Sequence, residues 1–232
     1  MPRSHRQREL PDLAPLIVQA LLDPMLSLEG LLEGCDVARH CGFGRLCVPL
    51  SRLQPVRERL GAPGATRLDA VIAFPFGTIP PELKLQASEW AAEQGADALS
   101  VVPSMSALVD GNVNAFAEEL AQCCAVGLPV TVILDLNRMM PDVLGTAVEA
   151  AIDAGAAAVQ SGNGFGGAAT GEQIRNLVSH CRGRCGIQAA GGIHTLALCE
   201  ELLEAGATAL GTSSGPQLLQ ALRAPIASES TE

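Results

Sequence analysis

Short apolar runs alternate along the chain with longer amphipathic stretches. Each run spans four to seven residues and lacks the strict two-residue alternation of a half-exposed strand, so it predicts a strand buried on both faces, as in a parallel sheet. The eight predicted strands are Leu16–Ala20, Arg45–Val48, Leu68–Phe74, Asp97–Val102, Val130–Asp135, Ala157–Ser161, Cys185–Ala189 and Thr208–Thr212.

The stretches between these runs have the period of an amphipathic helix. The clearest is PELKLQASEWAAEQGAD, whose apolar face holds Leu83, Ala87, Trp90 and Ala91 and whose polar face holds Lys84, Gln86 and Glu93. This pattern predicts a solvated lysine. A glycine follows each of four helical runs and precedes a strand, at the position where glycine commonly ends a helix. These glycines are Gly95, Gly127, Gly155 and Gly206.

Eight strand–helix units of roughly 25 to 30 residues predict a single (β/α)8 TIM barrel, with an open doubly wound sheet as the alternative. No linker or change of composition divides the chain. We therefore expect an N-terminal extension over residues 1–15, the barrel over 16–223 and a flexible tail over 224–232. The segment Met25–Cys41 is expected to be an accessory helix outside the barrel, with Leu26, Leu31 and Val37 facing the barrel or a neighbour.

Composition narrows the possible partners and cofactors. Hydrophobic residues make up 48% of the chain and charged residues 17%, which is enough for a large core. The net charge of −10 argues against nucleic acid or a membrane surface as partners. No apolar stretch reaches the ~18 residues that span a bilayer, and the first residues lack an apolar signal core, so a cytoplasmic protein is expected.

The eight cysteines are interpreted as reduced, buried packing residues. His180, Cys181 and Cys185 do not have the spacing of a zinc site, and the vicinal pair Cys123–Cys124 lies on a predicted helix. We expect no metal and no cofactor.

Chemistry in a barrel gathers at the carboxyl ends of its strands. Three late strands end in loops rich in glycine and hydroxyl groups, Ser161–Gly171, Ala189–Thr195 and Gly211–Gly215, and such loops favour a phosphate or sulfate site. Asp135 and His194 are the ionisable candidates at strand ends. Either could act as an acid or base, although a hydrogen-bonding aspartate and a solvated histidine are the preferred interpretations.

The stretches VQSGNGFGGAAT, IQAAGGIHT and GATALGTSSG resemble deoxyribose-phosphate aldolases, in which they run close to VKTSTGFGxGGAT, VKASGGIRT and GATRIGTSSG. Upstream, FGRLCVPL, VIAFPFGTIPPELKLQASEWAAEQGADALSVVPS and VTVILD are also similar to that family, so the resemblance covers about residues 16 to 220. It implies a (β/α)8 barrel, a phosphorylated small-molecule ligand and a homodimer. The positions that match its phosphate-binding elements are Gly164, Gly191, Gly192, Gly211, Ser213 and Ser214.

The family's catalytic set is absent from the matching positions. Its imine-forming lysine falls at Gln160, its second lysine at Gln188 and its proton-transferring aspartate at Ser100. The early strand that commonly reads IDHT is IVQA here, whereas Cys47 persists, with a packed core thiol as the equal alternative interpretation. A carboxamide cannot form an imine, and the chain has a single lysine, Lys84.

Three functions remain open from the sequence. The preferred hypothesis is a catalytically degenerate, aldolase-like barrel that binds a phosphorylated metabolite or acts as a regulatory or partner subunit. The alternative is an active lyase, either a deoxyribose-phosphate aldolase or an enzyme that uses Asp135 or His194 without an imine. The second alternative is a structural protein with relic phosphate loops.

Overall fold

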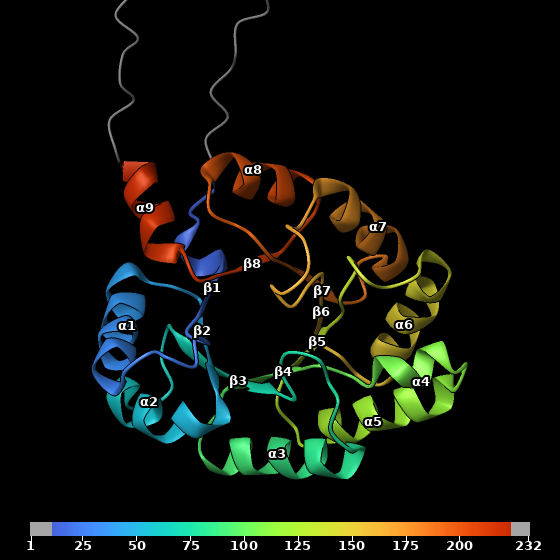
Figure 1. Ribbon diagram of the computed structural model, residues 1–232. Helices are drawn as coiled ribbons and strands as arrows, with labels where there is room; N and C mark the ends of the chain where they lie inside the picture. The colour runs from blue at the N-terminus through green and yellow to red at the C-terminus, as the bar shows by residue number, and fades with distance from the viewer. Residues whose placement is uncertain (1–10, 224–232) are drawn as a thin grey trace, which may run out of the picture.

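The computed structural model describes residues 11–223, which form a closed barrel of eight parallel strands in sequence order (Figure 1). Each strand lies within two residues of its predicted bounds. The strands are β1 Ile17–Ala20, β2 Arg45–Pro49, β3 Arg67–Ile72, β4 Ala98–Val101, β5 Val130–Ile133, β6 Ala158–Gln160, β7 Gly186–Ala190 and β8 Ala209–Thr212. The prediction of a single (β/α)8 barrel is confirmed, and the open sheet is wrong.

Helices surround the barrel, and two of them, α4 and α5, follow β4 (Figure 1). The helices are α1 Leu28–Cys41, α2 Leu53–Leu60, α3 Pro81–Glu93, α4 Met105–Val109, α5 Val113–Ala125, α6 Pro141–Asp153, α7 Gly171–Cys181, α8 Leu196–Glu204 and α9 Gly215–Arg223, with 3-10 turns η1 Ala14–Leu16 and η2 Leu50–Arg52. The loop after β6 enters α7 through a capping box in which Thr170 and Gln173 satisfy each other's backbone N–H groups. Among the described helices, none is long and apolar enough to cross a membrane.

Two expectations about the N-terminal part are corrected. The segment Met25–Cys41 is not accessory, because α1 is the regular connection between β1 and β2 and packs beside α2 and α9. Leu31 is buried, but Val37 is 38% exposed. Leu13 and Ala14, at the end of the expected extension, pack in the core just before β1. The rest of the expected extension and the expected tail, residues 1–10 and 224–232, lie outside the described residues.

The buried face of α3 differs from the predicted one. Ala91 is buried as expected, but Lys84 and Ser88 are fully buried too, whereas Leu83 and Trp90 are 48% and 40% exposed. The lysine tolerates burial because its Nζ lies 2.7 Å from Oε1 of Glu119 on α5. The hydropathy pattern predicted a solvated Lys84 because the pattern of one helix contains no information about an ion-pair partner on another helix.

Two apolar clusters organise the protein. The large one lies between the strands and the surrounding helices and includes Leu46, Leu99, Val132 and Leu210. The small one lies inside the barrel near the strand ends and consists of Val18, Cys47, Val71, Val102 and Ile133. Four members of the small cluster, Val18, Cys47, Val71 and Ile133, also line the cavity at the carboxyl ends of the strands.

Candidate functional site

The mouth of the barrel is a cavity of about 510 Å³ at the carboxyl ends of the strands. Ser100, Gln160 and Gln188 all line it, as the resemblance implied, and Gln160 and Gln188 are directly paired in the register of β6 and β7. Cys47 also lines the mouth but is buried. Burial raises the pKa of its thiol well above the usual value, so Cys47 stays neutral.

A chain of hydrogen bonds fixes both glutamines. Arg45 Nη2 donates to Gln188 Oε1 at 2.7 Å, Gln188 Nε2 donates to Gln160 Oε1 at 2.6 Å, and Gln160 Nε2 donates to the carbonyl of Gly162 at 2.6 Å. Since a guanidinium only donates, Arg45 determines which end of each amide faces which neighbour. Each amide nitrogen keeps a second hydrogen, so the pair can still donate to a ligand.

Arg45 and Asp69 are site residues that the sequence analysis missed. Arg45 begins β2 and reaches into the barrel, where its Nη1 donates to Thr131 Oγ1 at 3.2 Å and lies 3.6 Å from Asp69 Oδ2. Ser100 Oγ donates to the same oxygen at 2.8 Å. Burial raises the pKa of Asp69, and the positive charge of Arg45 and the bond from Ser100 oppose this rise. The barrel interior therefore holds a cation and an anion, Arg45 and Asp69, next to the three replaced positions.

The late loops contribute five of the six expected phosphate-binding residues to the mouth: Gly164, Gly191, Gly192, Gly211 and Ser213. Ser214 lies behind them, with its Oγ 2.8 Å from Nδ1 of His194, which does line the mouth. The N–H of Ser214 donates to Thr212 Oγ1 at 2.9 Å, so this donor is already occupied.

The first turn of α9 is partly capped from within the protein. Gln19, on β1 and 4% exposed, accepts from the N–H of Gly215 at 3.1 Å and donates to the carbonyl of Ser213 at 3.0 Å. An anion near α9 would therefore find fewer free N–H groups than the loop sequence suggests.

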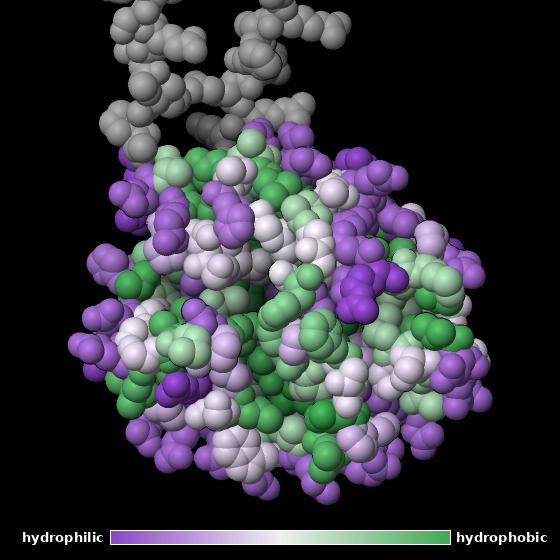
Figure 2. All heavy atoms as spheres, in the orientation of Figure 1, coloured by the Kyte–Doolittle hydropathy of each residue, from purple (hydrophilic) through white to green (hydrophobic). Residues whose placement is uncertain are grey.

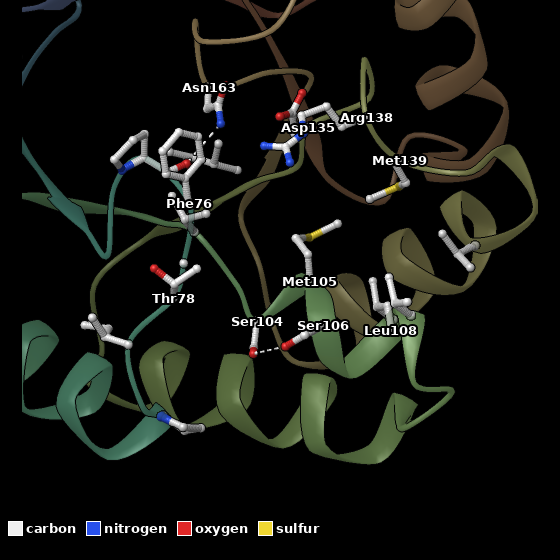
Figure 3. Close-up of a pocket in the computed structure, with 18 of the residues that line it drawn as sticks. Phe76, Thr78, Ser104, Met105, Ser106, Leu108, Asp135, Arg138, Met139 and Asn163 are labelled. Carbon is white, nitrogen blue, oxygen red and sulfur yellow. Dashed lines mark hydrogen bonds between the residues drawn. The ribbon is translucent and has the colours of Figure 1, made fainter.

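Asp135 and His194, the two candidate acid–base residues, line different cavities. Asp135 lies in a second cavity of about 1010 Å³ beside the mouth (Figure 3). Its Oδ1 is buried without a hydrogen-bond donor among the described residues. Ile133 and Asn163 line both cavities and form their shared wall.

An aromatic cluster adjoins that wall. The ring of Phe165 lies edge-on to those of Phe74 and Phe76. Its centroid is 5.8 Å from the Phe74 centroid and 5.7 Å from the Phe76 centroid. Asn163 Nδ2 donates to the carbonyl of Pro75 at 3.0 Å, which ties the loop after β6 to the loop after β3. Figure 2 shows apolar residues in and below the hollow at the centre of this face.

Comparison with curated proteins gives relatives along nearly the whole chain. The chain is 36% identical over 209 residues to the deoxyribose-phosphate aldolase of Trichormus variabilis, covering 90% of this chain and 92% of that protein. It is 35% identical to that of Thermosynechococcus vestitus (92% and 99% covered) and 34% to that of Thermococcus gammatolerans (91% and 97%). No protein-family model matches the chain.

Solved structures give the same picture. The aldolase QR15 superposes with a TM-score of 0.87 at 27% identity, covering 92% of this chain and 96% of its own. The deoxyribose phosphate aldolase of Aeropyrum pernix, described as having a unique tetrameric structure, superposes with a TM-score of 0.82 at 27% identity and covers 91% of each chain.

Proposed function

The chain belongs to the deoxyribose-phosphate aldolase family, and we propose that it binds a phosphorylated small metabolite at the barrel mouth without forming an imine. The observation that carries this proposal is Gln160, an amide fixed by hydrogen bonds where the resemblance implies the reactive lysine. Its role would then be that of a sensor or a regulatory or partner subunit. The cytoplasmic location and the homodimer or other protein partner expected from the sequence belong to the same proposal.

None of the side chains that line the mouth can form an imine with a substrate. A class I aldolase needs an amine that is nucleophilic near neutral pH, and an amide nitrogen has no available lone pair. Lys84, the one lysine of the sequence, is fully buried between α3 and α5 and lines neither cavity. Ser100 donates to Asp69, so its hydroxyl is engaged as well.

Binding needs fewer special groups than catalysis. The spare N–H groups of Gln160 and Gln188, the hydroxyl of Ser213 and the glycine backbone of the late loops offer donors to phosphate and sugar oxygens. No lysine or arginine occurs in the three late loops. Bare phosphate should therefore bind weakly, on the order of millimolar, and a sugar phosphate that also reaches the glutamines should bind more tightly.

An active lyase is the second candidate, and the names of the curated relatives favour it. Those relatives are called deoxyribose-phosphate aldolases, and the match covers nearly their full length. An active enzyme with this mouth would need a route without an imine, for which His194 is the one proposed acid–base residue that lines the cavity.

Two measurements separate these functions. Borohydride trapping and a retro-aldol assay with deoxyribose 5-phosphate should both be negative, and sustained turnover free of host aldolase would establish the lyase instead. Isothermal titration should show binding of deoxyribose 5-phosphate, reduced in Ser213→Ala but unchanged in Ser179→Ala, an exposed control on α7. If neither phosphate nor the sugar phosphate binds, the structural alternative with relic loops is the better explanation.

The glycines of the late loops are poor sites for such a test. Gly192 has a φ of +63°, and a Cβ there would lie 2.9 Å from the Cβ of Ala168. A valine at Gly192 would therefore disturb the loop whether or not it binds an anion, whereas Ser213→Ala removes only a hydroxyl.

A further inference from the structure

The cavity beside the mouth has no part in the proposed function. It is enclosed by the loops that follow β3, β4 and β5, together with α4 and the first turn of α6. Its volume of about 1010 Å³ is that of a pocket for a small molecule. Three loops distant in sequence are thus arranged around one space.

Most of the cavity wall is apolar and adaptable. Met105 and Leu108 come from α4, and Met139 comes from the loop after β5; Figure 3 shows these side chains around the open space. Methionine side chains are flexible and polarizable, so they accommodate apolar groups of different shapes. This part of the wall is suited to an apolar body and offers it no charge.

One end of the cavity is charged, and its two charges are not paired with each other. Figure 3 shows Asp135 and Arg138 together at this end. Neither takes part in an ion pair between described residues, and Oδ1 of Asp135 has no donor. Arg138 is exposed, and its guanidinium carbon lies 5.9 Å from the centroid of the Phe76 ring, a contact that leaves its N–H donors open to a ligand.

The backbone holds these charges in place. The N–H groups of Arg138 and Met139 both donate to the carbonyl of Asp135, at 3.0 and 2.8 Å, so the loop forms a tight turn around this point. A buried carboxylate oxygen without a donor is costly unless a ligand supplies one. A ligand with a positive and a negative group close together can satisfy both side chains at once.

We propose that this cavity binds a free α-amino acid with an apolar side chain. Its ammonium donates to the Asp135 carboxylate, its carboxylate accepts from the Arg138 guanidinium, and its side chain lies among Met105, Leu108 and Met139. A fatty acid would leave Asp135 without a donor, and an apolar amine would leave Arg138 without an acceptor. A zwitterion with an apolar body uses all three parts of the wall.

The test is a calorimetric and thermal-shift titration of the full chain with glycine, L-alanine, L-leucine, L-methionine and L-phenylalanine. Affinity should rise with the size of the apolar side chain by about fourfold per methylene. Each charge-assisted contact should be worth about tenfold to a hundredfold. Accordingly, N-acetyl-L-methionine, which lacks the cation, and L-methioninamide, which lacks the anion, should each bind that much more weakly than L-methionine.

Two variants test which charged group of the ligand each side chain binds. For each variant the ratio of two ligand affinities is measured, because a general loss of stability would lower both affinities alike. Asp135→Asn should remove the preference for L-methionine over its N-acetyl form, and Arg138→Gln the preference over the amide. Arg175→Gln, an exposed control on α7, should retain both preferences. The proposal is overturned if no amino acid binds up to its solubility limit, if the derivatives bind as tightly as L-methionine, or if the variants keep both preferences. Because the mouth is not involved, these outcomes are independent of phosphate binding.

Discussion

Replacing Lys84 with methionine should destabilise the protein strongly, because the change leaves a buried carboxylate without its counter-ion. The side chains of Lys84 and Glu119 are 0% and 1% exposed, and Nζ lies 2.7 Å from Oε1. That same oxygen accepts from the N–H of Ser104 at 3.0 Å, and Oε2 has no donor. After the substitution, Glu119 would keep one backbone donor for a full buried charge.

The expected size of this effect follows from the burial of both groups. Breaking a buried ion pair from one side costs about 3–5 kcal/mol, because the remaining charge cannot recover its hydration. Methionine fills much of the space of the lysine stem, so little of the loss should come from a cavity. For a chain of this length the change corresponds to a fall in Tm of about 6–20 °C.

Urea unfolding can be followed through Trp90, the one tryptophan of the chain, which lies on the same helix as Lys84. The double variant Lys84→Met/Glu119→Gln should be clearly more stable than Lys84→Met alone, because its buried pair is neutral. Arg59→Met, which removes the cation of the exposed pair with Asp36, serves as the matched control and should leave the midpoint almost unchanged. A loss for Lys84→Met no larger than that of the control would refute the reasoning, and so would a double variant less stable than the single one.

Three further results are expected. A hydrogen bond from Cys181 lowers the pKa of Cys185 from 9.0 to about 7, so iodoacetamide labelling of Cys185, read by mass spectrometry, should rise with a midpoint near pH 7 and shift upward in Cys181→Ala. Gly77→Ala should destabilise several times more than Gly42→Ala in thermal unfolding: both glycines have φ near +70°, but a Cβ at Gly77 would meet a backbone oxygen at 2.2 Å, whereas Gly42 has nothing within 4 Å. Gln160→Lys should still show no retro-aldol turnover with deoxyribose 5-phosphate, because the residue on β4 that would relay the proton is a serine; turnover in this variant would show that the relay is dispensable.

The strands could be predicted because each one is buried on both faces. A short continuous apolar run bounded by helical patterns leaves few other structures, so runs such as Val130–Asp135 and Thr208–Thr212 lie within two residues of β5 and β8. The face of α3 could not be predicted, because the burial of Lys84 depends on a glutamate 35 residues away on another helix. The hydropathy of the α3 sequence alone cannot reveal a partner on another helix.

The residues of the candidate site could be predicted where they lie at the carboxyl ends of strands, and the others could not. Gln160, Gln188 and Ser100 reach the mouth because side chains near the ends of parallel strands point to one place. Arg45 and Asp69 lie further from the carboxyl ends of their strands. Their only signal was a charged residue at the start of one apolar run and inside the next. The cavity around Asp135 gave no signal, because three loops that are separate in sequence build it.

The charges inside the barrel suggest why glutamines are accommodated where the resemblance implies lysines. Arg45 and Asp69 already form one cation and one anion at the base of the mouth. A lysine at position 160 or 188 would add positive charge beside Arg45, whereas an amide adds none and joins the hydrogen-bond chain.

That chain also sets what the mouth can recognise. The oxygen of each amide accepts one hydrogen bond within the protein, that of Gln188 from Arg45 and that of Gln160 from Gln188, while each nitrogen keeps one free hydrogen. The two nitrogens therefore offer the cavity a pair of donors whose orientation is set from within the barrel. Such donors suit ligands rich in acceptor oxygens, such as phosphates and carbonyl compounds. Reversing the amides would break the bond from Arg45, so this preference is fixed by a residue that touches no ligand.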